Sequence, residues 1–231
     1  MEPEIVDLQN FLNRMGAKIE GAGTNAIKIM GVKNLKDVSY NIMPDRIEAG
    51  TLLCSAAITG GKIKLNHVEP AHIAPVLEKL QEAGCDLKIG KNEIELETKK
   101  RLKSVDIRTM PYPGFPTDMQ AIFVSLLCLA HGTSVVVENI FENRYKYTQE
   151  LIRMGAKIKI EGKTAIIKGS RKLYGTNVVA TDLRGGASVV LAGLAAKGKT
   201  QVDNIKYILR GYENLDEKLN SLGANVKILL N

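Results

Sequence analysis

A helical pattern that ends in glycine recurs four times along this chain of 231 residues, and it constrains the fold more than any other feature. The glycines are Gly16, Gly84, Gly155 and Gly223, so successive copies lie 68, 71 and 68 residues apart. In each copy an apolar pattern of helical period stops at the glycine and a short alternating strand follows, which predicts a helix with a glycine C-cap. A period of about 70 residues is longer than that of the common solenoid repeats and indicates a duplicated supersecondary unit.

A second set of similar segments lies between these copies. Each contains an aspartate, an apolar helix rich in small residues, a glycine, an alternating strand and an asparagine; the segments are residues 44–68, 116–140 and 180–205. A further strand is predicted just before each aspartate, at residues 38–43, 105–110 and 177–181. One unit is therefore strand, helix, strand, helix, strand, strand. We expect an α+β fold of about three and a half such βαβαββ units.

The units at both ends of the sequence are incomplete. Residues 1–31 hold only the second helix and the last two strands of a unit, whereas residues 38–97 and 104–168 each complete one. The final unit ends after a single predicted strand, residues 222–230. An edge strand and a half-unit leave apolar faces without cover. We therefore expect this chain to be part of a larger arrangement of such units or to be completed by a second chain.

The composition is that of an ordinary globular protein, with 45% apolar and 25% charged residues. The acidic start lacks the features of a signal peptide, and no apolar run reaches the ~18 residues of a membrane span. We therefore expect a cytoplasmic protein with no membrane partner.

The net charge of +7 suits anionic ligands. Many lysines alternate with apolar residues, as in residues 156–169, which is typical of the solvated face of a sheet. Aromatic residues are only 5% of the chain, so a surface that stacks nucleic-acid bases has little support. Small anions are the favoured partners, and no nucleic-acid partner is expected.

The cysteines and histidines do not suggest a metal site. The three cysteines are widely spaced and fit packing positions, as reduced core thiols (Cys54, Cys85 and Cys128). The three histidines show no metal-ligand spacing with one another or with the cysteines. We expect no bound metal.

Three aspartates occupy equivalent places, at or near the N-terminus of the first helix of each unit: Asp45, Asp118 and Asp182. An aspartate in this place is often only an N-cap. However, Arg46 follows Asp45 directly and Arg184 follows Asp182 by two residues. A cation at the positive end of a helix dipole costs stability, so these arginines indicate an anion nearby. Both interpretations of the aspartates, cap and working group, remain open from the residues alone.

Another arginine, Arg210, precedes a predicted helix and is followed by Gly211, which permits close approach of the backbone. Helix N-termini that carry arginines bind phosphate or carboxylate groups well. If three units pack around a common axis, these N-termini point to one place. That convergence is a hypothesis at this stage.

The sequence resembles the enolpyruvyl transferases. The resemblance lies in the motifs PDRIEAGT, PGFPTDMQA, FENRY, ATDLR and RGYE in this order, and in the opening EPEIVD, and it covers essentially all 231 residues. It implies an inside-out α/β barrel of two domains with three units each. Residues 1–43 would be the last half-unit of one domain, and residues 44–231 would be the other domain without its final strand. The missing N-terminal portion, or another copy of the chain, would cover the open edge.

The resemblance is greatest to the branch of the family that acts on UDP-N-acetylglucosamine. It implies transfer of an enolpyruvyl group from phosphoenolpyruvate to the sugar 3-hydroxyl, with release of phosphate and without a cofactor, in the synthesis of peptidoglycan precursors. Two alternatives remain open: a non-catalytic domain that binds a nucleotide sugar or another anion, and an enzyme like 5-enolpyruvylshikimate-3-phosphate synthase.

The resemblance also implies roles for individual residues. Asp118 would contact the sugar hydroxyl and act as the general base, and Arg184 and Arg210 would hold phosphoenolpyruvate. The backbone at Ile140 would contact the sugar nucleotide, and Arg144, near a mobile loop, would also bind substrate.

Further candidates are less specific. Asp45 and Arg46 match a pair at the hinge, with a structural role or a ligand contact. Glu2 and Glu4 are weaker candidates for neighbours of the ligand. In the family the acid is a cysteine on a flexible loop, and a Lys-Asn pair also binds phosphoenolpyruvate; neither motif occurs here. We therefore expect the isolated chain to be inactive or nearly so.

Overall fold

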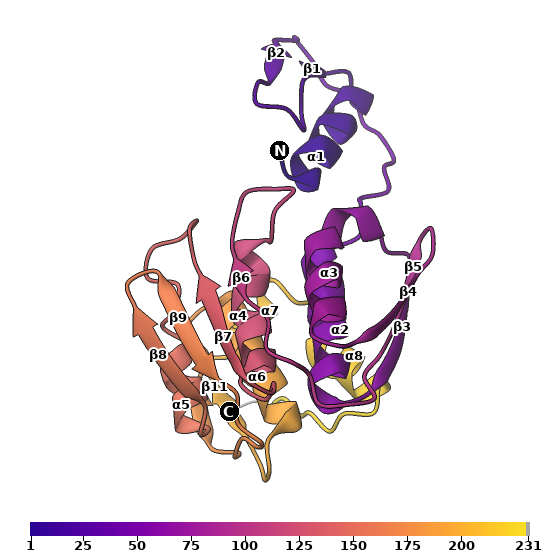
Figure 1. Ribbon diagram of the computed structural model, residues 1–231. Helices are drawn as coiled ribbons and strands as arrows, with labels where there is room; N and C mark the ends of the chain where they lie inside the picture. The colour runs from indigo at the N-terminus through magenta and orange to yellow at the C-terminus, as the bar shows by residue number, and fades with distance from the viewer. Residues whose placement is uncertain (230–231) are drawn as a thin grey trace.

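Three helices pack against one another at the centre of the protein, as the computed structural model of residues 1–229 shows (Figure 1). They are α2 (Arg46–Thr59), α4 (Thr117–Leu127) and α6 (Leu183–Ala195). Small residues on these helices leave room for the side chains of neighbouring elements. A Cβ atom on Gly50 would lie 2.7 Å from Cδ1 of Ile73 and 2.8 Å from Cε of Met119. The core of the chain is therefore the junction of the first helices of three units.

Three sheets surround these helices. In chain order the strands are β3 (Lys62–Asn66), β4 (Asp86–Ile89), β5 (Glu93–Glu97), β6 (Ile107–Arg108), β7 (Thr133–Val137), β8 (Lys157–Glu161), β9 (Thr164–Lys168), β10 (Asn177–Val179) and β11 (Gln201–Asp203). The sheet orders are β3-β5-β4, β6-β7-β9-β8 and β10-β11, with parallel pairing only in β6–β7 and β10–β11. In Figure 1 the first sheet lies to the right of the helices and the second to the left. Helices inside and sheets outside give the α+β arrangement expected from the sequence.

The second helices of the units end where the glycine period predicts. These helices are α1 (Pro3–Arg14), α3 (Ala74–Glu82), which follows the short 3-10 helix η1 (Pro70–Ile73), α5 (Thr148–Arg153) and α8 (Leu215–Ser221). The glycines that follow them have φ angles of 104°, 104°, 95° and 97°, in the left-handed region (Gly16, Gly84, Gly155 and Gly223). Glycine adopts this region without the steric penalty of a Cβ atom, and the predicted C-caps are confirmed. A short helix, α7 (Lys206–Leu209), was not predicted.

The predicted strand at residues 38–43 is wrong. The corresponding strands β6 and β10 pair in parallel with the strand that follows the central helix of their own unit. Residues 38–43 instead run as an exposed to half-buried connection between the N-terminal segment and α2, and they pair with no strand among residues 1–229. An extended segment without a hydrogen-bonded neighbour does not form a strand. Residues 104–168 form the complete unit that was expected, whereas residues 38–97 lack its first strand.

The predicted last strand, residues 222–230, is also absent from the described part of the chain. In the earlier units β4 and β8 hydrogen-bond only to the second strand of their own hairpin, β5 or β9. Residues 222–229 follow α8 in the same way, but no hairpin partner follows them within the described residues, and they are irregular. Leu230 lies outside the described residues.

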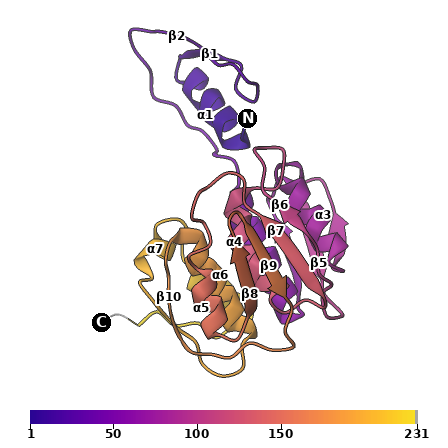
Figure 2. The ribbon, with the colours of Figure 1, turned by 60° about the vertical axis from the view of Figure 1, so that its left-hand side comes forward.

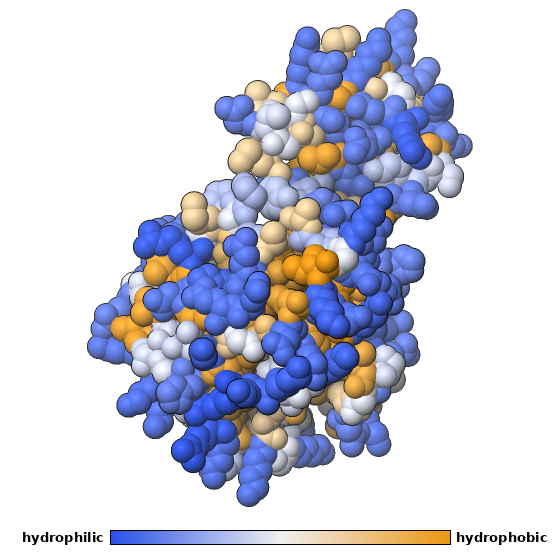
Figure 3. Space-filling model, turned by 45° about the vertical axis from the view of Figure 1, so that its right-hand side comes forward, coloured by the Kyte–Doolittle hydropathy of each residue, from blue (hydrophilic) through white to orange (hydrophobic). Residues whose placement is uncertain are grey.

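The N-terminal segment forms a separate lobe. It contains α1 and the antiparallel pair β1 (Lys18–Glu20) and β2 (Lys28–Met30), which is the half-unit expected for residues 1–31. Figures 1 and 2 show the lobe projecting from the body, and Figure 3 shows the narrow junction between them. Several of its apolar side chains are exposed: Ile5, Leu8, Ile27, Ile29, Met30, Val32 and Leu35. Within residues 1–229, no helix has the length and apolar character needed to cross a bilayer.

Candidate active site

The N-termini of the three central helices line one cavity of about 840 Å³. Its charged lining residues come from α1 and from the starts of α2, α4 and α6: Glu4, Asp7, Asp45, Arg46, Asp118 and Arg184. The cavity lies between the lobe and the body. The hypothesis that these helix N-termini converge is confirmed.

Two of the three equivalent aspartates are N-caps. Oδ1 of Asp45 accepts hydrogen bonds from the backbone N–H of Ile47 at 2.7 Å and of Glu48 at 3.0 Å. Oδ1 of Asp182 accepts from the N–H of Arg184 at 3.1 Å and of Gly185 at 2.9 Å. Both carboxylates satisfy orphan donors of a first helical turn, so we interpret them as structural.

Asp118 is different, because it lies inside its helix. The N-cap of α4 is Pro116, which has extended backbone angles, and Asp118 is the second residue of the helix. The sequence-based expectation of equivalent places is therefore wrong in detail, since Asp118 lies two positions further along than Asp45 and Asp182. Within the described residues its carboxylate binds arginine side chains rather than the backbone of the first turn, and the residue lines the cavity.

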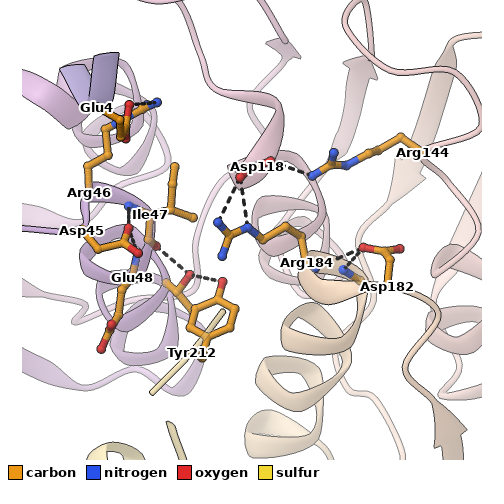
Figure 4. A network of polar contacts seen from close by, with 12 residues as sticks. Glu4, Asp45, Arg46, Ile47, Glu48, Asp118, Arg144, Asp182, Arg184 and Tyr212 are labelled. Carbon is orange, nitrogen blue, oxygen red and sulfur yellow. Dashed lines mark hydrogen bonds and ion pairs between the residues drawn. The ribbon is translucent and has the colours of Figure 1, made fainter. Parts of the chain in front are cut away.

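The carboxylate of Asp118 lies between two guanidinium groups (Figure 4). Arg144 donates from Nη2 to Oδ1 at 2.9 Å, and Arg184 donates from Nε and Nη2 to Oδ2 at 3.2 and 3.0 Å. Both arginine side chains are largely buried, whereas that of Asp118 is 38% exposed. The structure thus brings together three residues that the sequence proposed separately.

The arginines control the charge of Asp118. Burial on its own raises the pKa of this carboxyl group, but the charges and hydrogen bonds of Arg184 and Arg144 outweigh burial and hold the pKa below its ordinary value of 3.8. Asp118 is therefore ionised at neutral pH. It is also a weak base as long as both arginines bind it.

Arg184 is held by a residue that the sequence analysis did not single out. Its guanidinium carbon lies 5.1 Å from the centroid of the Tyr212 ring, a cation–π geometry. Tyr212 is buried, and its hydroxyl lies 2.9 Å from Oγ1 of Thr51. Because the Thr51 hydroxyl donates its only hydrogen to the carbonyl of Ile47, Tyr212 is the donor. The signal was present in the RGYE motif, but only its arginine and glycine were considered.

One donor of Arg184 has no acceptor. Nη1 is buried and has no hydrogen-bond partner among residues 1–229. A buried, unsatisfied donor on a cation is costly, and an anion that accepts from it recovers that cost.

Arg46 faces the cavity but is already paired. It donates from Nε to Oε1 of Glu4 at 2.8 Å and from Nη2 to Oε2 at 3.3 Å. This pair joins the start of α2 to α1 of the lobe. Glu2 binds the N-terminal ammonium group at 2.8 Å and is not part of the cavity lining.

The cavity lining does not include three predicted ligand-binding residues: Arg144, Arg210 and Ile140. Arg210 is exposed at the C-terminus of α7, and its side chain forms no hydrogen bond or ion pair with the described residues. The backbone N–H of Ile140 donates to Oε1 of Glu138 at 2.8 Å, so it is occupied within the protein.

The three cysteines are buried in the core and none lines the cavity. Burial raises the pKa of Cys128 to about 12 and that of Cys54 well above its ordinary value. None of them faces a ligand in the cavity.

Repeated α+β units around a three-helix centre, one of them a complete βαβαββ unit, with an aspartate and arginines at the helix N-termini, are the features of an enolpyruvyl transferase. A sequence profile described as EPSP synthase (3-phosphoshikimate 1-carboxyvinyltransferase) matches residues 1–219. The chain belongs to this enolpyruvyl transferase family.

Two curated relatives illustrate the similarity. UDP-N-acetylglucosamine 1-carboxyvinyltransferase 2 of Caldanaerobacter subterraneus subsp. tengcongensis is 55% identical over 226 residues, which is 97% of this chain and 54% of the relative. UDP-N-acetylglucosamine 1-carboxyvinyltransferase of Geobacter metallireducens is 52% identical over 98% of this chain and 54% of the relative. The chain spans about half the length of the curated relatives it matches.

Solved structures agree on the fold. The enolpyruvyl transferase NikO from Streptomyces tendae has a TM-score of 0.85 and 28% identity, over 98% of this chain and 55% of that one. EPSP synthase from Acinetobacter baumannii has a TM-score of 0.75 over 96% of this chain and 55% of that one. Its identity is 20%, so it supports the fold alone.

Proposed function

We propose that this chain forms one half of an enzyme that transfers an enolpyruvyl group from phosphoenolpyruvate to the 3-hydroxyl of UDP-N-acetylglucosamine, in the synthesis of peptidoglycan precursors. The observation that carries the proposal is the carboxylate of Asp118 at the edge of a cavity, held by Arg144 and Arg184. Relatives of 52–55% identity named for this sugar nucleotide support the choice of substrate. We infer a cytoplasmic setting, as the sequence predicts.

In this proposal Arg184 binds the phosphate or carboxylate of phosphoenolpyruvate. Its Nη1 atom is a buried donor without an acceptor among the described residues, so it is ready to bind an anionic oxygen. The planar guanidinium fork suits phosphate and carboxylate groups better than an ammonium does. Arg46 faces the same cavity, but the carboxylate of Glu4 already balances its charge.

Asp118 accepts the proton of the sugar 3-hydroxyl. While Arg184 and Arg144 both bind it, its pKa is too low for efficient proton abstraction. A bound anion competes for Arg184 and adds negative charge nearby, and both effects raise the pKa of Asp118. The base therefore becomes effective after phosphoenolpyruvate has bound.

The reaction then has two steps. The hydroxyl proton passes to Asp118, the sugar oxygen bonds to carbon 2 of phosphoenolpyruvate, and an acid protonates the methylene carbon. In the second step the bond from carbon 2 to the phosphate oxygen breaks, phosphate leaves, and the methyl group loses a proton so that the double bond forms again. No cysteine of this chain lines the cavity. We propose that the acid is a residue of the other half of the enzyme, which corresponds to the part of the relatives that this chain does not match.

The same proposal assigns residues 1–43 to one domain and residues 44–231 to the other, with the pair Arg46–Glu4 at their junction. The open edge beside residues 222–229 would be covered by a strand from the remaining part of the enzyme. Ligand contacts of Arg210 and Ile140 stay predictions from the resemblance.

Binding experiments test the substrate class. Titration calorimetry of the chain with UDP-N-acetylglucosamine and with shikimate 3-phosphate should show tighter binding of the sugar nucleotide. Tighter binding of shikimate 3-phosphate would favour the shikimate-pathway alternative instead.

A turnover experiment separates an enzyme from a binding domain. The chain is mixed with the unmatched N-terminal part of the Caldanaerobacter relative, produced as a separate chain, and with both substrates. We expect release of inorganic phosphate that the chain alone does not give and that Asp118→Asn abolishes. Phosphate release that is equal with the wild type and with Asp118→Asn would contradict the role of Asp118.

A further inference from the structure

Glu138 is a buried carboxylate that no motif of the sequence singles out. It follows β7 directly, and its side chain is 0% exposed. Four neutral donors surround it. Oε1 accepts from the hydroxyl of Thr109 at 2.8 Å and from the N–H groups of Ile140 and Phe141 at 2.8 and 3.1 Å, and Oε2 accepts from the hydroxyl of Thr117 at 3.0 Å.

These donors lie on three separate segments. Thr109 follows β6, Thr117 is the first residue of α4, and Ile140 and Phe141 belong to the turn after β7. Glu138 therefore joins the approach to α4, its first turn and the following turn at one point. A buried carboxylate is expensive unless it is fully hydrogen-bonded, and an apolar residue would serve packing alone better.

The segments that Glu138 joins carry the candidate active site. Thr117 immediately precedes Asp118. The ring centroid of Phe141 lies 4.9 Å from the guanidinium carbon of Arg144, and Arg144 binds Oδ1 of Asp118. Glu138 therefore connects to both members of the Asp118–Arg144 pair. It binds Thr117, which precedes Asp118, and it binds the backbone of Phe141, whose ring packs on Arg144.

We propose that Glu138 is a positioning residue of the active site, which fixes Arg144 against Asp118 by holding Thr117 and the turn at Phe141. The inference rests on the proposed function, because the placement matters only if Asp118 works as a base. Glu138 itself is buried and acts through its neighbours.

Two substitutions separate positioning from charge. Glu138→Gln keeps one oxygen for the three donors at Oε1 and turns an amide toward the Thr117 hydroxyl, which can accept from it. Glu138→Ala removes all four contacts. The readout is the pKa of Asp118, followed by carbon-13 NMR of the chain labelled at aspartate.

A positioning role and a purely electrostatic role of Glu138 predict opposite changes in the pKa of Asp118. Positioning predicts that the pKa of Asp118 rises in Glu138→Ala, because Arg144 is released, and stays low in Glu138→Gln. If Glu138 acts only as a nearby negative charge, the pKa falls in both variants. If it only supports the fold, thermal stability falls and the pKa does not change. Either of these last two results overturns the proposal.

A milder variant covers the case in which Glu138→Ala does not fold. Thr117→Val removes one donor, and Thr148→Val is its matched control, since Thr148 is also the first residue of a helix and its hydroxyl donates to the carbonyl of Tyr145 at 2.7 Å. We expect the pKa of Asp118 to rise in Thr117→Val only. An equal effect of both variants contradicts the proposal.

Binding gives the link to function. The affinity for UDP-N-acetylglucosamine should fall about tenfold in Glu138→Ala, which corresponds to the loss of one good hydrogen bond. It should stay within about threefold in Glu138→Gln. Equal losses in both variants would contradict positioning. If the wild-type chain does not bind the sugar nucleotide, the proposed function fails, whereas the pKa comparison still decides the role of Glu138.

Discussion

Arg184 binds the carboxylate of Asp118 through a single oxygen, Oδ2, which receives Nε at 3.2 Å and Nη2 at 3.0 Å. The third nitrogen, Nη1, is buried and has no acceptor in the described part of the chain. The pair joins α4 to α6, the first helices of two different units. The site therefore exists only when the units are packed together, and one of its cations has a buried donor that no described residue satisfies.

The first prediction concerns Asp118→Asn. Removal of the carboxylate charge leaves Arg144 and Arg184 without their counter-ion, so the variant should bind inorganic phosphate about tenfold more tightly than the wild type. Titration calorimetry measures this. The matched control is Asp86→Asn, whose carboxylate pairs with Lys99 on the surface, and it should not change the affinity. Weaker phosphate binding by Asp118→Asn would show that these arginines do not form the anion site.

The second prediction concerns pH. Because the pKa of Asp118 in the folded protein lies below its ordinary value of 3.8, its ion pairs stabilise the fold at every pH above that value. This contribution is lost as the pH falls through the lowered pKa. At pH 7 Asp118→Asn should lower the free energy of unfolding by about 1 kcal/mol, a small amount because the carboxylate is 38% exposed and solvent screens it.

Urea denaturation of the wild type and of Asp118→Asn between pH 7 and pH 3 tests this linkage. The difference in unfolding free energy should be constant above the ordinary pKa and should shrink below it. A difference that grows on acidification would mean that the pKa of Asp118 is raised.

The third prediction is that Arg184→Lys lowers the affinity for phosphoenolpyruvate by about tenfold or more. Lysine keeps the positive charge but loses the planar fork and the stacking on Tyr212. Arg153→Lys is the control, since Arg153 forms only an exposed pair with Glu150. Unchanged affinity in Arg184→Lys would show that charge alone binds the anion.

The fourth prediction separates the ring of Tyr212 from its hydroxyl. Tyr212→Phe keeps the ring beside Arg184 and loses the hydrogen bond to Thr51, so it should cost about 1 kcal/mol of stability and change phosphate affinity little. Tyr212→Leu also removes the cation–π contact and should weaken phosphate binding several-fold. Equal binding by the two variants would rule out a role of the ring in orienting Arg184.

Local sequence signals predicted much of the fold. The period of Gly16, Gly84, Gly155 and Gly223 predicted four helix ends, because the left-handed conformation at a C-cap is a property of one residue. Strands depend on neighbours elsewhere in the chain. Residues 38–43 and 222–229 have alternating patterns but no neighbouring strand to pair with among the described residues, and they do not form strands.

Part of the candidate site was also predictable from local signals. The residue types at the helix N-termini pointed to Asp118 and Arg184, but the sequence could not show that Pro116 takes the cap position and frees the carboxylate. Tyr212 and Glu138 were missed, because a buried tyrosine looks like core and a single glutamate looks like surface until the units are packed.

The measurement that tests the central claim most directly is the pKa of Asp118 with and without saturating inorganic phosphate, followed by carbon-13 NMR of the chain. If an anion binds Arg184 beside this carboxylate, the pKa should rise when phosphate is added, and Arg184→Lys should reduce the effect. An unchanged pKa at saturating phosphate would show that the anion binds elsewhere, and it would contradict the proposed site.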